Sequence, residues 1–338
     1  KNKGFTAKVL AVSDKPVLNS LNKYHRNPDG GAVFSYKNGG WIYVSNSEIS
    51  NKKGGVGAFK FNKNGKLLKY YKILEKTDRN CSGGKTPHNT WLSCEEHSKG
   101  MVWQCYPDGK KPAMPLPQLG IFSHEAAAVD PKTNIVYLTE DDHDGLIYKF
   151  VPKYNTDKNY SDGILYAACR GKDKTIDWKE IKDPSAEKKK TRYQVNKGYR
   201  NNKWEGCVYH PEGFIYICES NKGIYRYDIR NNTLELFYKS KVTNDPKKLN
   251  SPDNICITPK GNILVSEDPG GLWTEYLELW IINHHTKQAL PFLQVHGHFG
   301  SELAGVAFSP NGRKLYFSSQ RGVDGRGITY EVSGNFNF

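Results

Sequence analysis

The 338-residue sequence lacks long apolar runs, and none of its hydrophobic stretches approaches the roughly 20 residues needed to cross a bilayer. It shows no apolar leader and begins with Lys1, so we expect that any signal peptide has been removed or never existed. The helical period of about 3.6 residues is also scarce outside one polar segment. These absences exclude a helical membrane protein and favour an all-β fold.

Disulfide-scaffold spacing is missing as well. The seven cysteines are an odd number, and they lie inside strand-like runs rather than at the intervals of a small cross-linked domain. Basic residues outnumber acidic ones, 49 to 35, which gives a net charge of +14. This charge suits anionic partners such as phosphorylated compounds. Because the basic residues form no groove interleaved with aromatics, we do not expect a nucleic-acid partner.

The chain contains short runs of Tyr, Val, Ile, Phe and Trp, each cut by Gly, Asn, Asp or Pro, which is typical of strands. A unit of two or more such strands recurs six times, and repeats of about 40–50 residues favour a β-propeller. The first strands of the six copies are expected at 31–34, 81–85, 125–129, 205–209, 253–257 and 304–308. We therefore predict an all-β, six-bladed β-propeller forming a single domain over residues 1–338.

Two further features fit this architecture. A Lys-, Asp- and Asn-rich segment at 152–202 lengthens the step between the third and fourth copies, so we predict a polar insertion between these blades. The N-terminal run at 6–10 is expected to complete a blade begun by the C-terminal run at 328–332, which closes the ring and removes exposed strand edges.

Four potential metal ligands share one position in the repeat, because each precedes a proline by six residues. The pairs are Cys81 and Pro87, Glu125 and Pro131, Glu205 and Pro211, and Asp253 and Pro259. The small residues that follow suit the crowded innermost strand of a blade. We therefore expect these four side chains to surround one mouth of the central channel.

An acid also closes the second strand of each of these copies, at Glu95 or Glu96, Glu140, Glu219 and Glu267. The second strand runs antiparallel to the first, so we expect these acids at the same mouth, with Glu219 and Glu267 as possible orienting groups. Crowded carboxylates raise one another's pKa values unless cations neutralise them. Many oxygen ligands favour calcium, and the thiol indicates a softer or transition ion as well.

Two motifs resemble the PhoX-type alkaline phosphatase family: NCSGGKTPHNTWLSCEE at 80–96, and SHEAAAVDP at 123–131 followed by VYLTED at 136–141. Weaker likeness continues at 205–206, 251–254 and 320–322. The resemblance implies a six-bladed propeller that hydrolyses phosphomonoesters at iron, Fe(III), and calcium, Ca²⁺, around a bridging oxo group. The bridging group or a metal-activated water would attack in line.

The resemblance also implies site residues. Cys81 would be the thiolate ligand of iron, and Glu96, Glu125, Glu205 and Asp253 would be ligands shared by iron and calcium. Glu95 fits the repeat and Glu96 the family spacing, and we choose Glu96. Lys203 stands where the family has an arginine and loses the bidentate fork, so we expect Lys203 and Arg321 together to steady the phosphoryl charge.

The sequence thus predicts a monomeric phosphatase, secreted or periplasmic or extracellular, that releases phosphate from small phosphomonoesters. One alternative is a calcium-dependent lactonase on the same fold, which needs no thiolate ligand. Another is a non-catalytic propeller that binds a protein or glycan, with metal ions only bracing its channel.

Overall fold

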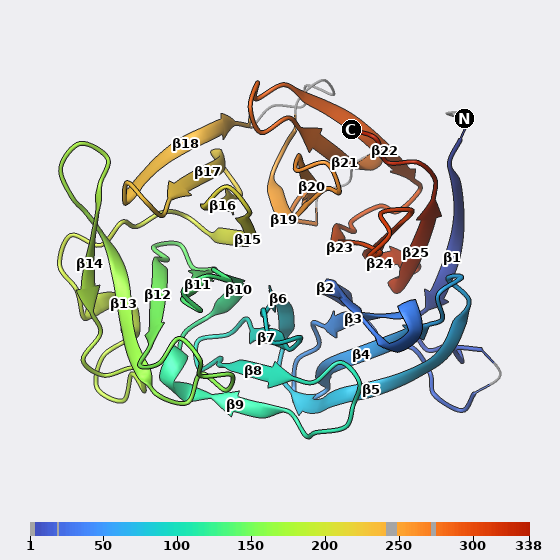
Figure 1. The fold of residues 1–338 in the computed structure, drawn as a ribbon, viewed down its shortest axis with the longest axis horizontal. Helices are drawn as coiled ribbons and strands as arrows, with labels where there is room; N and C mark the ends of the chain where they lie inside the picture. Colours follow the sequence, from blue (N-terminus) through green and yellow to red (C-terminus); the bar gives the residue numbers. More distant parts are fainter. Residues whose placement is uncertain (1–3, 19, 241–248, 272–274) are drawn as a thin grey trace.

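A computed structural model describes residues 4–18, 20–240, 249–271 and 275–338 and shows six sheets arranged around a central axis (Figure 1). None of the helices in these ranges has the length and apolar character that crossing a bilayer requires. The predicted six-bladed β-propeller is confirmed. Short 3-10 turns are described at η1 (Lys37–Gly39), η2 (Pro117–Leu119) and η3 (Thr191–Tyr193).

Each blade is an antiparallel sheet. Blade one has β2 (Pro28–Ser35), β3 (Trp41–Ser47), β4 (Gly54–Phe61) and β5 (Leu67–Thr77). Blade two has β6 (Asn80–Lys85), β7 (Trp91–Glu95), β8 (Val102–Cys105) and β9 (Met114–Leu116). Blade three has β10 (His124–Val129), β11 (Val136–Glu140), β12 (Ile147–Pro152), β13 (Gly163–Arg170) and β14 (Ile176–Glu180).

The other half of the ring follows the same order. Blade four has β15 (Trp204–His210), β16 (Phe214–Glu219), β17 (Gly223–Asp228) and β18 (Thr233–Lys239). Blade five has β19 (Pro252–Ile257), β20 (Ile263–Glu267), β21 (Tyr276–Ile282) and β22 (Ala289–His296). Blade six has β23 (Leu303–Phe308), β24 (Lys314–Val323), β25 (Arg326–Ser333) and, from the other end of the chain, β1 (Thr6–Val12).

The ring closes as the sequence predicts. Strand β1 pairs antiparallel with β25, and Thr6 lies opposite Ser333. The first strand of the chain is therefore the outermost strand of the blade that contains the last. This pairing joins strands from the two ends of the chain in one blade and so closes the ring.

The innermost strands are the first strands of the six blades, and they surround a channel cavity of about 410 Å³. Their small residues are needed because neighbouring strands approach closely. A Cβ atom on Gly84 of β6 would lie only 2.0 Å from the carbonyl oxygen of Ala127 in β10. Glycine at this position therefore allows blades two and three to meet at the axis.

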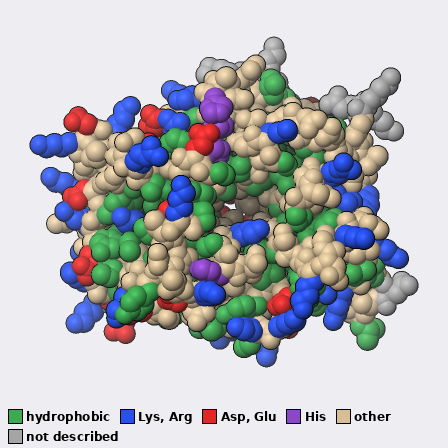
Figure 2. Space-filling model, in the orientation of Figure 1, with side chains coloured by type: hydrophobic (Ala, Val, Ile, Leu, Met, Phe, Trp, Pro, Cys, Tyr) green, Lys and Arg blue, Asp and Glu red, His purple; other side chains and the backbone are tan. Residues whose placement is uncertain are grey.

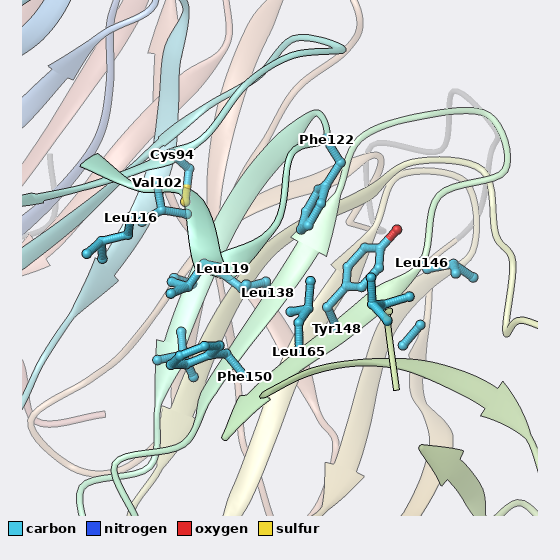
Figure 3. Close-up of a cluster of buried hydrophobic side chains, with 14 of the residues drawn as sticks. Cys94, Val102, Leu116, Leu119, Phe122, Leu138, Leu146, Tyr148, Phe150 and Leu165 are labelled. Atoms are coloured by element: carbon cyan, nitrogen blue, oxygen red, sulfur yellow. The ribbon is translucent and has the colours of Figure 1, made fainter. Parts of the chain in front are cut away.

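The hydrophobic core is divided into six clusters, one between each pair of neighbouring blades. Figure 3 shows the cluster between blades two and three, where Cys94 and Val102 pack with Leu138 and Phe150. Because both faces of a blade are covered, the middle strands are buried throughout, as β3 is. This explains why they appear in the sequence as continuous apolar runs rather than as alternating patterns.

The predicted insertion at 152–202 is smaller than expected. Strand β13 is the fourth strand of blade three, and β14 is a fifth strand on its outer edge. Both are regular blade structure, but their polar and charged residues obscure the strand pattern, and three of the five residues of β14 are exposed. Outside the sheet lie the loops at 153–162 and 171–175 and the segment after Glu180, which returns to β15.

Candidate metal centre

The side chains predicted to meet at one mouth of the channel do so. Cys81, Glu125, Glu205 and Asp253 are all buried near the starts of their innermost strands. The Sγ atom of Cys81 donates a hydrogen bond to Oε1 of Glu125 over 3.3 Å. Ligand atoms of Cys81, Glu96 and Glu125 lie within 4.8 Å of one another. Those of Glu125, Asp141 and Glu205 do the same, so Glu125 belongs to both groups.

A β-bulge turns each of these side chains toward the axis. The register between the first and second strands shifts between Asn80 and Gly83, between His124 and Ala127, between Trp204 and Cys207, and between Pro252 and Ile255. Each shift spans one of the four predicted ligands. Bulges redirect side chains in this way and are common next to active sites.

The acids that end the second strands do not point toward this group, which corrects the sequence prediction. Glu95 accepts hydrogen bonds from the backbone amides of Asp78, at 2.9 Å, and Met101, at 3.3 Å. Glu267 accepts from the backbone amide of Asn250 at 2.8 Å. These carboxylates stabilise nearby loops, because a strand end exposes backbone donors that need partners.

Glu140 is turned away as well. Its Oε2 atom accepts a hydrogen bond of 2.7 Å from the hydroxyl of Tyr148, and its Oε1 atom lies 2.7 Å from the guanidinium of Arg192. Glu219 is buried, and neither of its carboxylate oxygens has a hydrogen-bond partner among the described residues. None of the four strand-end acids therefore belongs to the groups of clustered ligand atoms.

The residue after the strand-end acid faces the mouth instead. Glu96 follows Glu95 and clusters with Cys81, and Asp141 follows Glu140 and clusters with Glu125. The positions predicted from the strand ends, such as Glu140, were therefore one residue too early. The bulge in the first strand changes which position of the second strand lies opposite the ligand. Glu96, which was chosen from the family spacing, lies with Cys81 and Glu125 in this cluster.

Blades one and six contribute residues that the sequence prediction missed. Ligand atoms of Asp29, Glu48 and Glu302 lie within 4.8 Å of one another. Asp29 begins the innermost strand of blade one as Cys81 does in blade two, but no proline follows it at the same distance. The run of small residues after Asp29, at 30–32, was the signal that could have found it.

We refer to the following residues as the acidic ring: Asp29, Glu48, Cys81, Glu96, Glu125, Asp141, Glu205, Asp253, Asp268 and Glu302. Burial raises the pKa of Glu125 well above its usual value, and Asp253 and Glu205 raise it further. Burial, followed by the charge of Glu48, raises the pKa of Glu96 to about 10. Without a cation Glu96 and Glu125 therefore retain protons more readily than ordinary glutamates.

The carboxylates of the acidic ring also affect the thiol of Cys81. Burial raises the pKa of Cys81 well above its usual value, and the neighbouring carboxylates Asp29 and Glu125 add to the effect. A thiolate would be unfavourable here unless positive charge were supplied. A bound metal ion reverses this balance, because a coordinating thiol is deprotonated outright.

Two features of the hydrogen bonding also indicate that the ring fits cations. The Nε2 atom of Gln320 lies within hydrogen-bond distance of Asp29 at 2.5 Å, Glu302 at 2.6 Å and Glu48 at 2.8 Å. An amide nitrogen has only two protons for these three acceptors. The buried Oδ1 atom of Asp253 has no hydrogen-bond partner among the described residues. A donor set of many carboxylates and one thiol suits hard cations together with a transition ion.

Three basic side chains lie beside the acidic ring. The Nζ atom of Lys203 is 3.0 Å from Asp141, and although burial opposes it, Asp141 and Glu205 raise the pKa of Lys203. Arg321 contacts Glu302 at 2.5 Å and donates to the carbonyl of Gly300 at 2.8 Å. Its guanidinium is thus occupied by protein groups.

Arg79 is the third basic residue, and the sequence prediction missed it. It immediately precedes Asn80 at the start of β6, and its charge lowers the pKa of Glu96 against the larger effect of burial. Its guanidinium forms no hydrogen bond or ion pair with any residue the structure describes. Its place two residues before Cys81, as Lys203 is two before Glu205, was the available signal.

Comparison with known proteins gives a family match. The family model for alkaline phosphatase PhoX matches residues 106–322, which is more than half of the chain. This range includes Glu125, Glu205 and Asp253 and begins after Cys81 and Glu96. The comparison with curated proteins gives no match.

Solved structures share the fold. A Pseudomonas fluorescens PhoX in complex with vanadate, a transition state analogue, is similar with a TM-score of 0.83 at 17% identity, covering 98% of this chain and 95% of that chain. A Bacteroides thetaiotaomicron protein of unknown function has a TM-score of 0.60 at 8% identity, covering 97% and 76%. A propeller in a nidogen/laminin complex has a TM-score of 0.54 at 10% identity, covering 90% and 98%.

Proposed function

Since the chain belongs to the alkaline phosphatase PhoX family and is a metal-dependent phosphatase, we propose that it hydrolyses small phosphomonoesters at the acidic ring. The observation that carries this proposal is the thiol of Cys81 held 3.3 Å from Glu125 inside a ring of buried carboxylates. A purely structural cluster of this composition would carry the cost of burying several acids and a thiol without any compensating charge.

We propose iron as the metal held by Cys81, with Glu96 and Glu125 beside it, and calcium as the partner ion. Glu205 and Asp253 would be shared between the two metals. The all-oxygen group of Asp29, Glu48 and Glu302 supports calcium, which prefers many oxygen ligands. When bound, these ions supply positive charge for the phosphoryl oxygens and lower the pKa of an attacking water.

The residues of the chain have separate tasks in this proposal. Arg79 and Lys203 would hold the non-bridging phosphoryl oxygens, whose negative charge spreads in the transition state. Asp141 would orient Lys203 through their 3.0 Å ion pair. Arg321 was predicted to contact the phosphoryl group, and its contacts with Glu302 and Gly300 support instead a role in holding the acidic ring in place.

We also propose that the protein is a monomer that acts outside the cytoplasm, the location that the family implies. The net charge of +14 supports attraction of phosphate esters to the site, and salt would screen it.

The test is elemental analysis of protein purified without chelator, with turnover of a generic aryl phosphate measured on the same sample. Iron together with calcium, and activity that is lost when both are removed and returns when they are restored, supports the proposal. Calcium alone with turnover of a lactone would identify a lactonase. Bound metal with no turnover of either substrate would identify a binding propeller and overturn the proposed function.

A further inference from the structure

A cluster of His210, Glu212 and His284 lies far from the acidic ring. His210 is the last residue of β15, whose second residue is Glu205, so this cluster belongs to the opposite face of the propeller. Glu212 is in the turn after β15, and His284 is in the turn between β21 and β22. Figure 2 shows histidine side chains gathered beside an acidic side chain on a face that contains the central opening.

The cluster has the composition and spacing of a transition-metal site. His210 and His284 are 2% and 7% exposed, and their rings are 4.3 Å apart. The Nε2 atom of His284 is 3.4 Å from Oε1 of Glu212. One ligand atom from each of the three residues lies within 4.8 Å of the others. Two imidazoles and a carboxylate are ligands that zinc commonly takes in proteins.

The hydrogen bonds of His210 fix which of its ring nitrogens could bind a metal. Its Nε2 atom lies 2.9 Å from the carbonyl oxygen of Gly261, which can only accept, so the proton is on Nε2 and the lone pair is on Nδ1. A histidine that binds a metal through one ring nitrogen usually donates a hydrogen bond to a carbonyl from the other, which fixes the orientation of the ring. The amide of Glu212 donates to Nδ1 over 3.2 Å and would have to release it.

A neighbouring cation, Arg226, is paired outside the cluster. Burial is the main cause that lowers the pKa of His284 and Arg226 is a lesser one, and the Arg226 guanidinium is paired with Glu235 on β18 at 2.6 Å. Glu212 is about half exposed and can move toward an ion. His210 and Glu212 come from blade four and His284 comes from blade five, so an ion bound to all of them would join these blades.

We propose that His210, Glu212 and His284 form a second metal site, which binds a zinc-like divalent transition ion and clamps blade four to blade five. Its two nitrogen ligands distinguish it from the acidic ring, whose oxygen-rich composition suits calcium. The fourth position of a tetrahedral site would be filled by water, as it is when a protein supplies three ligands. This site takes no part in phosphate-ester hydrolysis.

The test measures zinc uptake by the metal-loaded protein, using equilibrium dialysis against Zn²⁺ followed by elemental analysis. We expect the wild type to bind one more zinc per chain than the double variant His210→Ala/His284→Ala. The matched control is His296→Ala, an exposed histidine of blade five, which should bind zinc as the wild type does. Cobalt(II) should give the visible bands of a four-coordinate ion in the wild type and the control only.

Aryl phosphate turnover and a second variant are measured as well. Aryl phosphate turnover should be unchanged in the double variant, so failure of this site and failure of the phosphatase site are distinguishable. If the double variant does not fold, Glu212→Gln replaces it, because this half-exposed side chain can change with little effect on the core, and zinc affinity should fall at least about tenfold. Equal zinc uptake by the wild type and a folded variant, or uptake abolished by Cys81→Ala instead, overturns the proposal.

Discussion

The thiol of Cys81 in blade two donates a hydrogen bond to Oε1 of Glu125 in blade three over 3.3 Å. The two residues are 44 positions apart in the sequence, and each lies within a bulge near the start of an innermost strand. The bond requires a neutral thiol, whereas metal binding requires a thiolate. In the proposed centre, metal binding would therefore displace a proton, and ligation of both side chains would replace this hydrogen bond.

The first prediction concerns Cys81→Ser, which keeps the size of the side chain but removes the soft ligand. We expect iron content and aryl phosphate turnover to fall together, by more than the roughly 10- to 100-fold that loss of an outer partner of a ligand costs. Calcium bound to the carboxylates should be retained. Elemental analysis and steady-state kinetics on the same preparation measure both, and a variant with full activity and normal iron would exclude Cys81 as a ligand.

The second prediction separates two neighbouring acids. Glu96→Gln should reduce activity and metal content, because Glu96 clusters with Cys81 and Glu125. Glu95→Gln should leave activity almost unchanged. It should lower the free energy of unfolding by about 1–2 kcal/mol, because a neutral amide replaces the carboxylate that accepts hydrogen bonds from two backbone amides. Kinetics and denaturant unfolding of both variants provide the comparison, and the reverse pattern would place Glu95 in the site.

The third prediction concerns the basic residues. Arg79→Ala should lower kcat/KM for an aryl phosphate about 10- to 100-fold, the effect of losing a charge-assisted hydrogen bond of about 1.5–3 kcal/mol. The melting temperature should hardly change, because the Arg79 guanidinium has no ion-pair partner among the described residues. Arg321→Ala serves as the control and should lower the melting temperature, since it leaves the buried carboxylate of Glu302 unpaired.

The sequence predicted the number of blades, the closure by β1 and the positions of Cys81, Glu125, Glu205 and Asp253, because these depend on strand length, small residues and a repeated proline. It did not predict Glu48, Asp141 or Asp268. A bulge moves the pairing by one residue, and neither composition nor spacing reveals where a ladder slips. Asp29 was missed because no proline follows it at that distance. In blade six Pro310 follows Ala304 by six residues, so the repeat marks Ala304 and not Glu302.

The fourth prediction is a pH dependence of stability that only the metal-free protein shows. In the folded chain the pKa of Glu48 is raised from 4.5 to about 7, by burial and then by Asp29, and the pKa of Glu96 is raised from 4.5 to about 10, by burial and then by Glu48. The folded state therefore binds more protons than the unfolded state between pH 4.5 and these values, so stability falls as pH rises through this window.

Calorimetry at pH 5.5 and pH 8.5, before and after chelation, is the measurement. The chelated protein should melt at a lower temperature at the higher pH, whereas the metal-loaded protein should lose this dependence, because the ions keep the carboxylates charged at both pH values. Cys81→Ala in the chelated state should retain the slope, since the two glutamates remain. A chelated protein that is more stable at pH 8.5 would contradict the upward direction of these pKa shifts.

The last prediction concerns a buried arginine, Arg192, in the segment between β14 and β15. The guanidinium of Arg192 lies 2.7 Å from Glu140, 2.6 Å from Asp142 and 2.7 Å from Asp144, and the Glu140 side chain is fully buried. Arg192→Met keeps much of the apolar length of the side chain but leaves Glu140 without its cation. Breaking a buried pair from one side typically costs about 3–5 kcal/mol.

We expect denaturant unfolding to show a loss of this size for Arg192→Met, and a smaller loss for the double variant Arg192→Met/Glu140→Gln, because the uncompensated buried charge is then gone. Asp141, which holds Lys203, lies between Glu140 and Asp142, so the single variant should also raise KM for an aryl phosphate through a displaced loop. A matched Arg230→Met variant, in the exposed turn after β17, should change neither quantity. Equal losses in the single and double variants would show that Arg192 acts through packing rather than by pairing with Glu140.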